Sequence, residues 1–518
     1  MKIESLGMAC VEGLSRRIGR VALVDGGMGG RQIKAGLLLG AGLALAQKIK
    51  KEETGPRVGV VLPPGAGGTI ANLACVLAGK TPVNLNFTSG RSASDSAVRQ
   101  AELKIAITAR QMEEKLGEHF PAVDRRLDLG GMLKEAKLAA LFWSLLVIVL
   151  PAGLLAKLAG VPKDGGDQEA GLLFTSGSTG DPKGVVLTHR NILSNLGQID
   201  EVLGDLKLGS VLGCLPLFHS FGFTVTLWWP MTGGPKVVTY PSPLDPHALG
   251  EVIARNAVDL VVTTPTFLRT LMRRAGKEKL GRLKMVVTGA EKLPESLRKE
   301  FEEKIGVKVY EGYGMTEGSP VIAVNRPGLV KAGTVGRPVR GLEIRTVEEE
   351  TREVLPKGQS GILEFRGPNI FPGYLGRPDL TQKILQDGWY HSADFGKVDE
   401  DGFLTIEGRR ARFSKIGGEM VPHALVEEHL LGWLRGKGML HEGLQEFMVT
   451  AVEDEKKGES LVVLHSCEID PTGAEKALRD LGVPNLWIPR KFIKVKTVPI
   501  LASGKLDLAA GRKLAQNG

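Results

Sequence analysis

A loop of small and hydroxyl residues follows an apolar run at residues 172–191, LLFTSGSTGDPKGVVLTHRN. Glycines let backbone N–H groups turn toward an anion, hydroxyl groups add hydrogen-bond donors, and a lysine adds positive charge. This order of residue types predicts a phosphate-binding loop directly after a buried strand. The loop differs from a Walker A sequence, because Lys183 follows Pro182 and precedes Gly184. The residues expected to contact phosphate are Thr175, Ser176, Gly177, Ser178, Thr179, Gly180 and Lys183.

This segment resembles the signature loop of the adenylate-forming superfamily, which includes acyl-CoA synthetases, peptide-synthetase adenylation domains and luciferases. Four more segments resemble motifs of that family in the family's order. They are YEGYGMTEG (310–318) for adenine and magnesium, WYHSADFG (389–396) for ribose, EGRRARFSKIGGEMV (407–421) for the interdomain hinge and PILASGKLD (499–507) for the terminal lysine. The resemblance covers the chain from about residue 20 to about residue 510.

The resemblance implies a reaction in which a carboxylate attacks the α-phosphorus of ATP, so that an acyl-adenylate forms and pyrophosphate leaves. Charge that develops at phosphorus needs cations and fixed donors. In the family's pattern Thr316 contacts the α-phosphate and Glu317 binds Mg²⁺, a hard cation that prefers oxygen ligands. Lys505 is the implied catalytic lysine between the substrate carboxylate and the α-phosphate. The implied cofactors are therefore ATP and Mg²⁺, and the alternative for Glu317 or Lys505 taken alone is a solvated surface side chain.

The family's nucleotide contacts also have counterparts in this chain. Asp394 should accept both ribose hydroxyls, although Ser392-Ala393-Asp394 replaces the usual Thr-Gly-Asp. Arg409 should contact the ribose as well, and Tyr313 should cover one face of the adenine unless it is a packed core tyrosine. The loop matched to the family's other adenine contact consists of Gly289, Ala290 and Glu291.

The second half-reaction is implied to be attack of a thiol on the acyl-adenylate after the small C-terminal domain rotates. Lys415, Gly417 and Gly418 would line the approach of the thiol. Ala411 stands at the hinge position, where the family usually has Asp or Lys. His219 is similar to the residue that separates the acyl pocket from the nucleotide, and the alternative is a buried core histidine. Aromatic residues near His219, which suit either an alkyl chain or a core, are Phe218, Phe221, Phe223, Trp228 and Trp229.

A narrower resemblance bears on the thiol acceptor. The stretches 81–90, 101–116 and 415–428 resemble the acyl-ACP synthetase part of the bifunctional 2-acylglycerophosphoethanolamine acyltransferase/acyl-ACP synthetase family. An HxxxxD string from His119 to Asp124 lies inside the synthetase-like region, and we interpret it as coincidence. The implied function is activation of a fatty acid and its transfer to acyl carrier protein. The alternatives are coenzyme A as acceptor and, from another class, an inactive membrane-bound ATP-binding module.

Composition and charge are compatible with these partners. The chain has 518 residues, 42% hydrophobic and 24% charged, which is typical of a globular protein of several domains. The net charge of +9 suits an acidic carrier protein, polyanionic coenzyme A or an anionic membrane, and the patch RKFIKVK (490–496) adds to it. Neither an arginine-rich arm nor an aromatic RNA-binding motif is apparent in the sequence, so nucleic acid is not an expected partner. The four cysteines form no CxxC pair, which favours reduced thiols.

Short β-branched runs predict the fold class. The runs lie at 57–63, 236–240, 259–266, 284–289 and 307–314, and all except 236–240 end in Gly, Pro or Thr, as buried parallel strands often do. After residue 400 the pattern changes to a strand at 403–408, a helix at 421–434, a hairpin at 447–466, a helix near 472–481 and a strand at 491–496. We therefore expect a large α/β domain of the adenylate-forming type at 1–408 and a small, mobile α+β domain at 409–518.

One apolar segment stands apart from these patterns. Nineteen residues from Leu138 to Ala156 carry no charge and are flanked by Lys134, Lys137 and Lys157. The length would allow a membrane span, but a single span would separate strands of one α/β domain, and Pro151 interrupts it. We expect residues 138–157 to contact the membrane from one side, with a buried core helix as the alternative. No signal peptide is recognisable, so the expected location is the cytoplasmic face of the inner (plasma) membrane.

Overall fold

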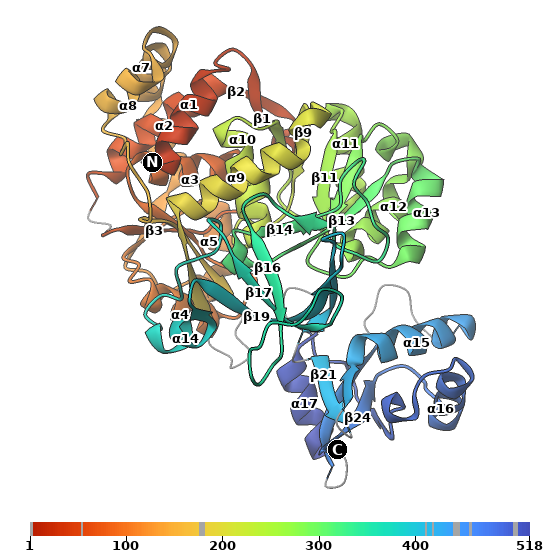
Figure 1. Cartoon of the computed structure of the whole chain (residues 1–518). Helices are drawn as coiled ribbons and strands as arrows, with labels where there is room; N and C mark the ends of the chain where they lie inside the picture. The colour runs from red at the N-terminus through yellow and green to blue at the C-terminus, as the bar shows by residue number, and fades with distance from the viewer. Residues whose placement is uncertain are drawn as a thin grey trace.

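The computed structural model describes residues 4–52, 55–175, 182–409, 412–416, 419–438, 446–454, 458–500 and 506–518. A large α/β part is followed by a smaller α+β part at the C-terminus, drawn in blue in Figure 1. Both features confirm the fold class expected from the sequence. In the described part of the chain the strands form four sheets, of which three belong to the large part.

The largest sheet contains three strands with nearly the same sequence: KVVT, LVVT and MVVT. Paired valines bury both faces of such a strand, and the last threonine stands at its carboxyl end. Strands β1 and β9 to β13 are parallel, whereas β2, β14 and β15 are antiparallel to their neighbours at the two ends. The spatial order among the described residues is β15 (Arg337–Pro338), β14 (Val321–Val324), β13 (Val309–Gly314), β12 (Met285–Thr288), β11 (Leu260–Thr263), β9 (Ser210–Gly213), β10 (Lys236–Thr239), β1 (Val21–Asp25) and β2 (Arg31–Lys34).

A second sheet carries the predicted phosphate loop at one edge. Its strands are parallel except for β8, which returns antiparallel to β7. Thr175, at the end of β7, lies opposite Lys183, at the start of β8. The order among the described residues is β6 (Arg125–Asp128), β5 (Ile105–Thr108), β3 (Arg57–Val60), β4 (Thr81–Asn84), β7 (Glu169–Thr175) and β8 (Lys183–Thr188).

Helices cover these sheets, and several of them begin at a side chain that caps the first turn. Thr188 and Asn191 form a reciprocal capping box at the start of α9, and Thr264 accepts a hydrogen bond at the start of α12. The helices of the large part are α1 (Leu6–Ser15), α2 (Ala35–Ile49), α3 (Ala66–Leu77), α4 (Arg91–Gln100), α5 (Arg110–Leu116), α6 (Leu129–Glu135), α7 (Lys137–Val149), α8 (Ala152–Ala159), α9 (His189–Leu203), α10 (Trp229–Thr232), α11 (Pro246–Asn256), α12 (Pro265–Leu280), α13 (Glu295–Ile305) and α14 (Pro378–Ile384).

The third sheet of the large part is antiparallel and positions the predicted ribose contacts. It is stabilised by Glu364, a fully buried carboxylate that pairs with Arg345 and Arg352. A buried charge is tolerated only when it is paired and hydrogen-bonded, as it is here. The strands among the described residues are β16 (Glu343–Val347), β17 (Gly361–Arg366), β19 (Trp389–Val398), β18 (Leu385–Gln386) and β20 (Leu404–Arg409), which pairs with β19.

The C-terminal part has a sheet and a core of its own. The expected strand at 403–408 corresponds to β20, so the change of sheet falls between Arg409 and Phe413. The expected hairpin corresponds to β23 (Phe447–Asp454) and β24 (Gly458–His465), whereas its turn, 455–457, lies outside the described residues. The other elements are β21 (Phe413–Ile416), β22 (Glu419–Pro422), α15 (His423–Gly436), α16 (Pro471–Asp480), β25 (Lys491–Lys494) and α17 (Leu508–Asn517).

The apolar segment at 138–157 forms α7 and the first part of α8. The helices are separated at Leu150 and Pro151, because proline lacks the N–H that would continue the first helix. Trp143 and Val147 are buried, but the opposite face of α7 is exposed, so a fully buried core helix is wrong. Among the described residues, no helix combines the length and the apolar character that crossing a membrane requires.

Candidate active site

Two tyrosines connect the predicted nucleotide contacts. Tyr374 lies between the phosphate hairpin and the magnesium motif: its hydroxyl donates to Glu317 Oε1 at 2.7 Å, and Lys183 Nζ is 5.5 Å from the centre of its ring. Burial and the neighbouring Glu317 carboxylate raise the pKa of Tyr374, which keeps its hydroxyl protonated as a donor. Lys183 and Glu317 are thereby brought together, as the resemblance implied. Thr175 lies beside them across the hairpin, whereas Ser176, Gly177, Ser178, Thr179 and Gly180 lie outside the described residues.

The magnesium motif begins where β13 ends. Thr316 and Glu317 belong to a short 3₁₀ turn, Thr316–Gly318, and the Phe371 N–H donates to the Glu317 carbonyl oxygen at 2.9 Å. The Thr316 hydroxyl donates to Ser220 Oγ at 3.2 Å, which places residue 316 beside the loop that contains His219. His219 is exposed, so the alternative of a buried core histidine is wrong.

Four of the five aromatic residues near His219 are buried in the core. The ring of Phe218 packs edge-on against that of His219, with 4.8 Å between the ring centres. Phe223 packs in the same way against Trp228, with 5.6 Å between the ring centres. Phe218, Phe223, Trp228 and Trp229 are all buried, whereas Phe221 is partly exposed. The core interpretation is therefore confirmed for the four buried side chains.

The predicted ribose contacts lie on two paired strands. Asp394 on β19 is opposite Arg409 on β20, and Arg409 Nε is 3.3 Å from Asp394 Oδ1. The other carboxylate oxygen of Asp394 accepts a short hydrogen bond from the hydroxyl of Tyr313. Burial and the Asp394 carboxylate raise the pKa of Tyr313, so the phenol stays a donor.

The departure from the family's Thr-Gly-Asp has a local explanation. Ser392 Oγ accepts a hydrogen bond from the Asp394 N–H at 3.1 Å and donates one to the Leu363 carbonyl oxygen at 2.7 Å. The serine hydroxyl therefore fixes the strand backbone before Asp394 without a glycine. Sequence reasoning singled out Asp394 but missed the roles of Ser392 and Tyr374.

The predicted adenine loop follows β12 and runs beside β13. A Cβ atom at Gly289 would lie 3.3 Å from the Gly312 carbonyl oxygen, so the two backbones approach closely. Ala290 has a positive φ of 66°, which is unusual for a residue with a side chain. Thr266, at the start of α12, donates a hydrogen bond from its hydroxyl to the Glu291 carboxylate at 2.7 Å. These contacts fix the loop against two neighbouring elements.

The small C-terminal part contacts the same loop. Lys292 Nζ lies 3.3 Å from Glu428 Oε2 on α15, which connects the two parts next to Glu291. Lys415 lies on β21, but its side chain is outside the described residues, as are Ala411, Gly417, Gly418 and Lys505. Their expected roles stay predictions.

The donor set fits a magnesium nucleotide. The lysine at the phosphate hairpin offers positive charge to phosphates. The carboxylate with an adjacent hydroxyl offers oxygen ligands to Mg²⁺. The aspartate beside an arginine offers acceptors to a ribose diol. Glu317, Thr316, Lys183 and Asp394 are the residues that would hold these groups.

Comparison with known proteins decides the family. The sequence model of the family described as AMP-binding enzyme matches residues 30–375. The chain belongs to the AMP-binding enzyme family. It is 31% identical over 360 residues to a long-chain-fatty-acid–CoA ligase of Bacillus subtilis, covering 68% of this chain and 62% of that relative. It is also 29% identical over 476 residues to a medium-chain fatty-acid–CoA ligase of Escherichia coli, covering 89% and 81%. The chain thus spans less than two thirds of the length of the Bacillus relative.

Solved structures of AMP-binding enzymes share the fold over nearly the whole chain. ATP-bound MatB from Rhodopseudomonas palustris is 24% identical with a TM-score of 0.82, covering 98% of this chain and 99% of that one. MenE from Bacillus subtilis, in complex with ATP and a magnesium ion, is 24% identical with a TM-score of 0.81, covering 99% and 100%. The chain therefore shares the two-part fold of these two proteins over nearly its whole length.

Proposed function

We propose that this protein activates a fatty acid with ATP and Mg²⁺ and transfers the acyl group to a thiol. The observation that carries the proposal is the convergence of the polar groups around two tyrosines. Tyr374 contacts both Lys183 and Glu317, and Tyr313 donates to Asp394. The names of the two fatty-acid–CoA ligases among the relatives support a fatty acid as substrate.

In the proposed first step a carboxylate oxygen of the fatty acid forms a bond to the α-phosphorus of ATP. The bond from that phosphorus to the bridging oxygen breaks, and pyrophosphate leaves with the electron pair. Lys183 holds the departing phosphates, Asp394 holds the ribose, and Lys505 offsets charge between the two reacting groups. Glu317 would hold Mg²⁺, which neutralises charge on the phosphate oxygens when it is bound.

In the proposed second step a thiol sulfur bonds to the acyl carbonyl carbon of the adenylate. The carbon–oxygen bond to AMP breaks, AMP leaves with the electron pair, and the thiol proton passes to solvent. The small C-terminal part rotates between the two steps, so that Lys415, Gly417 and Gly418 line the path of the thiol.

Coenzyme A is the acceptor that the relatives favour. Both relatives described above are named as CoA ligases. The narrower resemblance of the sequence to an acyl-ACP synthetase has no counterpart in these names, and we therefore place coenzyme A first.

Acyl carrier protein is the second candidate because of one surface feature. Arg490, Lys491 and Lys496 are exposed on or next to β25 in the small C-terminal part. Such a row of cations suits a strongly acidic protein partner, since complementary charge speeds and orients association.

A side-by-side transfer assay separates these candidates. The full chain is incubated with ATP, Mg²⁺ and radiolabelled palmitate in mild detergent, with either coenzyme A or holo-acyl carrier protein. Label on coenzyme A alone supports a fatty acyl-CoA ligase, and label on the carrier protein alone supports an acyl-ACP synthetase. If ATP binds but no acyl-adenylate forms with any fatty acid, the protein is an inactive ATP-binding module and the proposal is wrong.

A charge variant refines the outcome. Arg490→Glu with Lys491→Glu should lower transfer to the acidic carrier protein by about tenfold through lost electrostatic attraction. Transfer to coenzyme A should change much less, because the small thiol needs no protein docking surface.

We also propose that the protein works at the cytoplasmic face of the membrane. Long-chain fatty acids partition into lipid because their apolar chains leave water. An enzyme that rests on that surface meets its substrate at a high local concentration.

A further inference from the structure

Helix α7 is apolar on two opposite faces, of which one is packed. Its inner face contacts α2, where a Cβ at Gly40 would lie 2.1 Å from Ser144 Oγ and 2.9 Å from the Ala140 carbonyl oxygen. Only a residue without a side chain permits such an approach. The helix is therefore fixed on the large part and does not depend on its outer face for packing.

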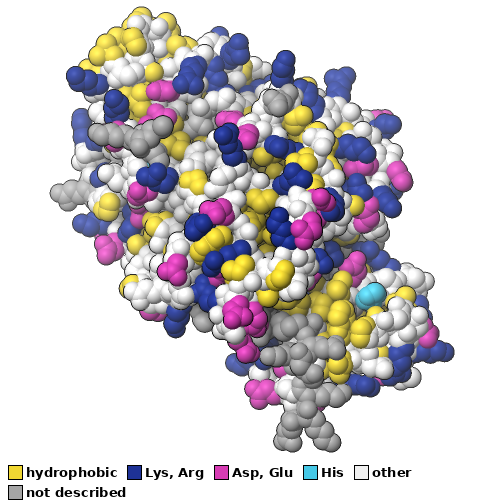
Figure 2. Space-filling model, viewed as in Figure 1, with side chains coloured by type: hydrophobic (Ala, Val, Ile, Leu, Met, Phe, Trp, Pro, Cys, Tyr) yellow, Lys and Arg dark blue, Asp and Glu magenta, His cyan; other side chains and the backbone are white. Residues whose placement is uncertain are grey.

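The outer face of α7 and α8 is a continuous row of exposed apolar side chains, here named the outer apolar face. A surface helix of a soluble protein normally turns charged and polar residues outward. Here residues 141, 145 and 148 recur at helical spacing and are 51%, 63% and 62% exposed. Figure 2 shows hydrophobic side chains gathered over these helices. The members of the outer apolar face are Leu138, Leu141, Phe142, Leu145, Ile148, Val149, Leu154 and Leu158.

Positive charges stand at the ends of this face. Lys134 and Lys137 are exposed at its N-terminal end, and Lys157 is exposed on α8. The nearby acidic side chain of Glu135 is paired with Lys48, and that of Glu12 with Arg16 at 2.8 Å. The margin therefore has excess positive charge, which complements anionic groups.

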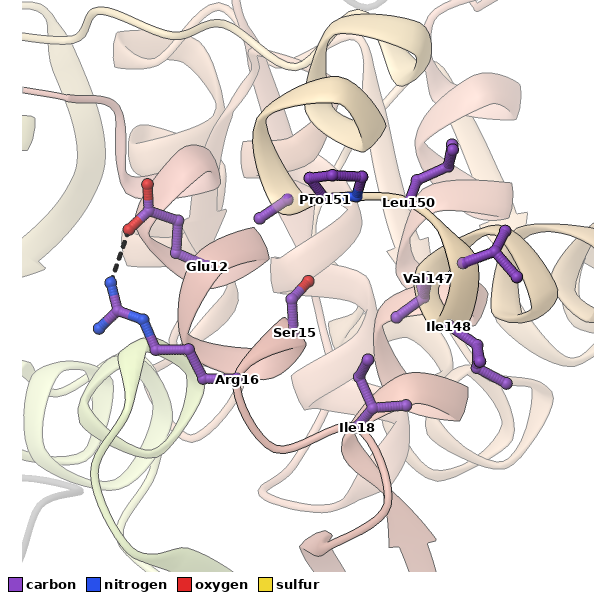
Figure 3. A pocket seen from close by; sticks show the side chains of 10 residues that line it. Glu12, Ser15, Arg16, Ile18, Val147, Ile148, Leu150 and Pro151 are labelled. Atoms are coloured by element: carbon purple, nitrogen blue, oxygen red, sulfur yellow. Dashed lines mark hydrogen bonds and ion pairs between the residues drawn. The ribbon is translucent and has the colours of Figure 1, made fainter.

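A hollow of about 470 Å³ lies beside the outer apolar face, between α1 and the Pro151 break. Figure 3 shows the Ser15 side chain pointing into this hollow, with the Arg16–Glu12 pair at its edge. Among the described residues, the buried hydroxyl oxygen of Ser15 has no hydrogen-bond partner. Polar residues line one side of the hollow and apolar residues line the other, which suits a molecule with one polar and one apolar end.

We propose that the outer apolar face inserts into the surface of a bilayer that contains anionic phospholipids, with the hollow at the level of the headgroups. Large exposed apolar patches mark interaction sites, and the basic margin selects an anionic surface over a neutral one.

The geometry favours insertion parallel to the membrane plane. With 13 residues, α7 is about 20 Å long, which is shorter than the roughly 30 Å of a bilayer core. Its inner face is occupied by α2, so only the outer side chains can enter the lipid. Contact from one side also keeps the strands before and after the segment on the same side of the membrane.

This inference rests on the proposed function only for its consequence, which is that a fatty acid reaches the enzyme from the lipid phase. Binding to the membrane is a property of the surface alone and can be measured without turnover. The two claims can therefore fail separately.

Vesicle flotation of the full chain tests the membrane surface. The wild type should float with phosphatidylcholine vesicles that contain phosphatidylglycerol, and it should float less with phosphatidylcholine alone. The variant Leu141→Ser, Leu145→Ser, Ile148→Ser should reduce the floated fraction by about tenfold or more, because each apolar side chain contributes to insertion. Its thermal unfolding should stay close to that of the wild type, since these side chains are exposed.

A matched variant replaces three equally exposed apolar residues elsewhere. Leu244, Val354 and Leu481 are 76%, 59% and 56% exposed. Leu244→Ser, Val354→Ser, Leu481→Ser should float like the wild type. Replacing Lys134, Lys137 and Lys157 by Gln should remove most of the preference for anionic vesicles.

Three outcomes would overturn the proposal. The wild type stays at the bottom of the gradient; or the apolar variant floats as well as the wild type; or light scattering detects a wild-type dimer that the apolar variant abolishes, so that a second copy covers the face. ATP–pyrophosphate exchange with octanoate, a soluble fatty acid, is measured in parallel. Flotation without exchange for octanoate, palmitate or any other fatty acid would defeat the proposed function but leave the membrane surface intact, and exchange without flotation would do the opposite.

Discussion

Asp394 and Arg409 lie directly opposite each other on β19 and β20, with Arg409 Nε 3.3 Å from Asp394 Oδ1. Since Tyr313 donates to the other oxygen of Asp394, both carboxylate oxygens have partners before a nucleotide binds. A ribose diol must therefore share or replace one of these contacts, and the partners hold the carboxylate in place for it.

Asp394→Asn should weaken ATP binding. The amide offers one acceptor in place of two and loses the charge, and hydrogen bonds to charged groups contribute about 1.5–3 kcal/mol. We expect the KM for ATP in ATP–pyrophosphate exchange to rise by roughly 10- to 100-fold. Asp480→Asn, at an exposed position of α16, is the control and should not change the KM. An unchanged KM in the Asp394 variant would remove Asp394 from the ribose site.

Tyr374→Phe should lower activity through Glu317. The substitution removes the hydrogen bond of 2.7 Å to Glu317 Oε1 but keeps the ring beside Lys183. We expect about a tenfold loss of adenylation at limiting Mg²⁺ and a smaller loss at saturating Mg²⁺, because one hydrogen bond to a charged group is lost. Tyr240→Phe removes a comparable bond to Asp245 on the surface and should have no effect. A loss that is independent of the Mg²⁺ concentration would contradict a positioning role for Tyr374.

Lys505→Ala should separate the two half-reactions. Adenylate formation should fall by about a hundredfold or more, because a charge contact with the transition state is lost. Transfer of the acyl group from preformed palmitoyl-adenylate to the thiol should stay nearly intact. Lys513→Ala, on α17, serves as the control. Equal loss of both half-reactions would defeat the assigned role of Lys505.

The buried carboxylate Glu311 should make stability depend on pH. Burial raises its pKa to about 7, above the value of 4.5 for an ordinary glutamate. The folded chain therefore binds more protons than the unfolded chain between these values, and the free energy of unfolding should fall as the pH rises from about 4.5 to about 7, by roughly 3 kcal/mol.

Glu311→Gln should remove this dependence. The amide oxygen can still accept the hydrogen bond of 3.0 Å from the Leu293 N–H. Urea unfolding should find the variant more stable than the wild type at pH 8 and similar to it at pH 5. Glu118→Gln, at an exposed position, should follow the wild type at both pH values. A Glu311→Gln variant that loses stability at pH 8 would show that the carboxylate is ionised and paired.

Two paired glutamates on the third sheet, Glu364 and Glu343, should differ in their contribution to stability. Glu364 is fully buried and pairs with Arg345 and Arg352, so Glu364→Gln leaves those charges without their partner and should cost about 3–5 kcal/mol in urea unfolding. The exposed pair of Glu343 and Arg366 lies on the same sheet, and Glu343→Gln should cost less than about 1 kcal/mol. Equal effects of the two substitutions would contradict this difference in burial.

The strands and the order of the motifs were predictable because their signals are local. Three buried strands were predictable from their own residues, KVVT, LVVT and MVVT. The loop after β7 is recognisable from its glycines, hydroxyls and lysine. Local patterns also gave the hairpin of the C-terminal part, since the two strands are separated by a short polar turn.

The connections between motifs were not predictable, because they join residues far apart in the sequence. Tyr374 is 57 positions from Glu317, and the residues next to Tyr374 in the sequence do not indicate that contact. Ser392 replaces the family's threonine one position before an alanine, and only the backbone shows that its hydroxyl still fixes Asp394. The hydrophobicity of α7 predicted contact with something apolar, but which face would be packed depends on Gly40 of a distant helix.

In Figure 1, α7 and α8 stand at the end of the molecule farthest from the C-terminal part. Because α7 packs closely against α2 at Gly40, the orientation of the outer apolar face on a membrane also fixes the orientation of the whole large part. A molecule that rests on lipid through that face holds its C-terminal part away from the headgroups. The proposed thiol acceptor would then reach the protein from the aqueous side, and the proposed fatty acid would reach it from the lipid.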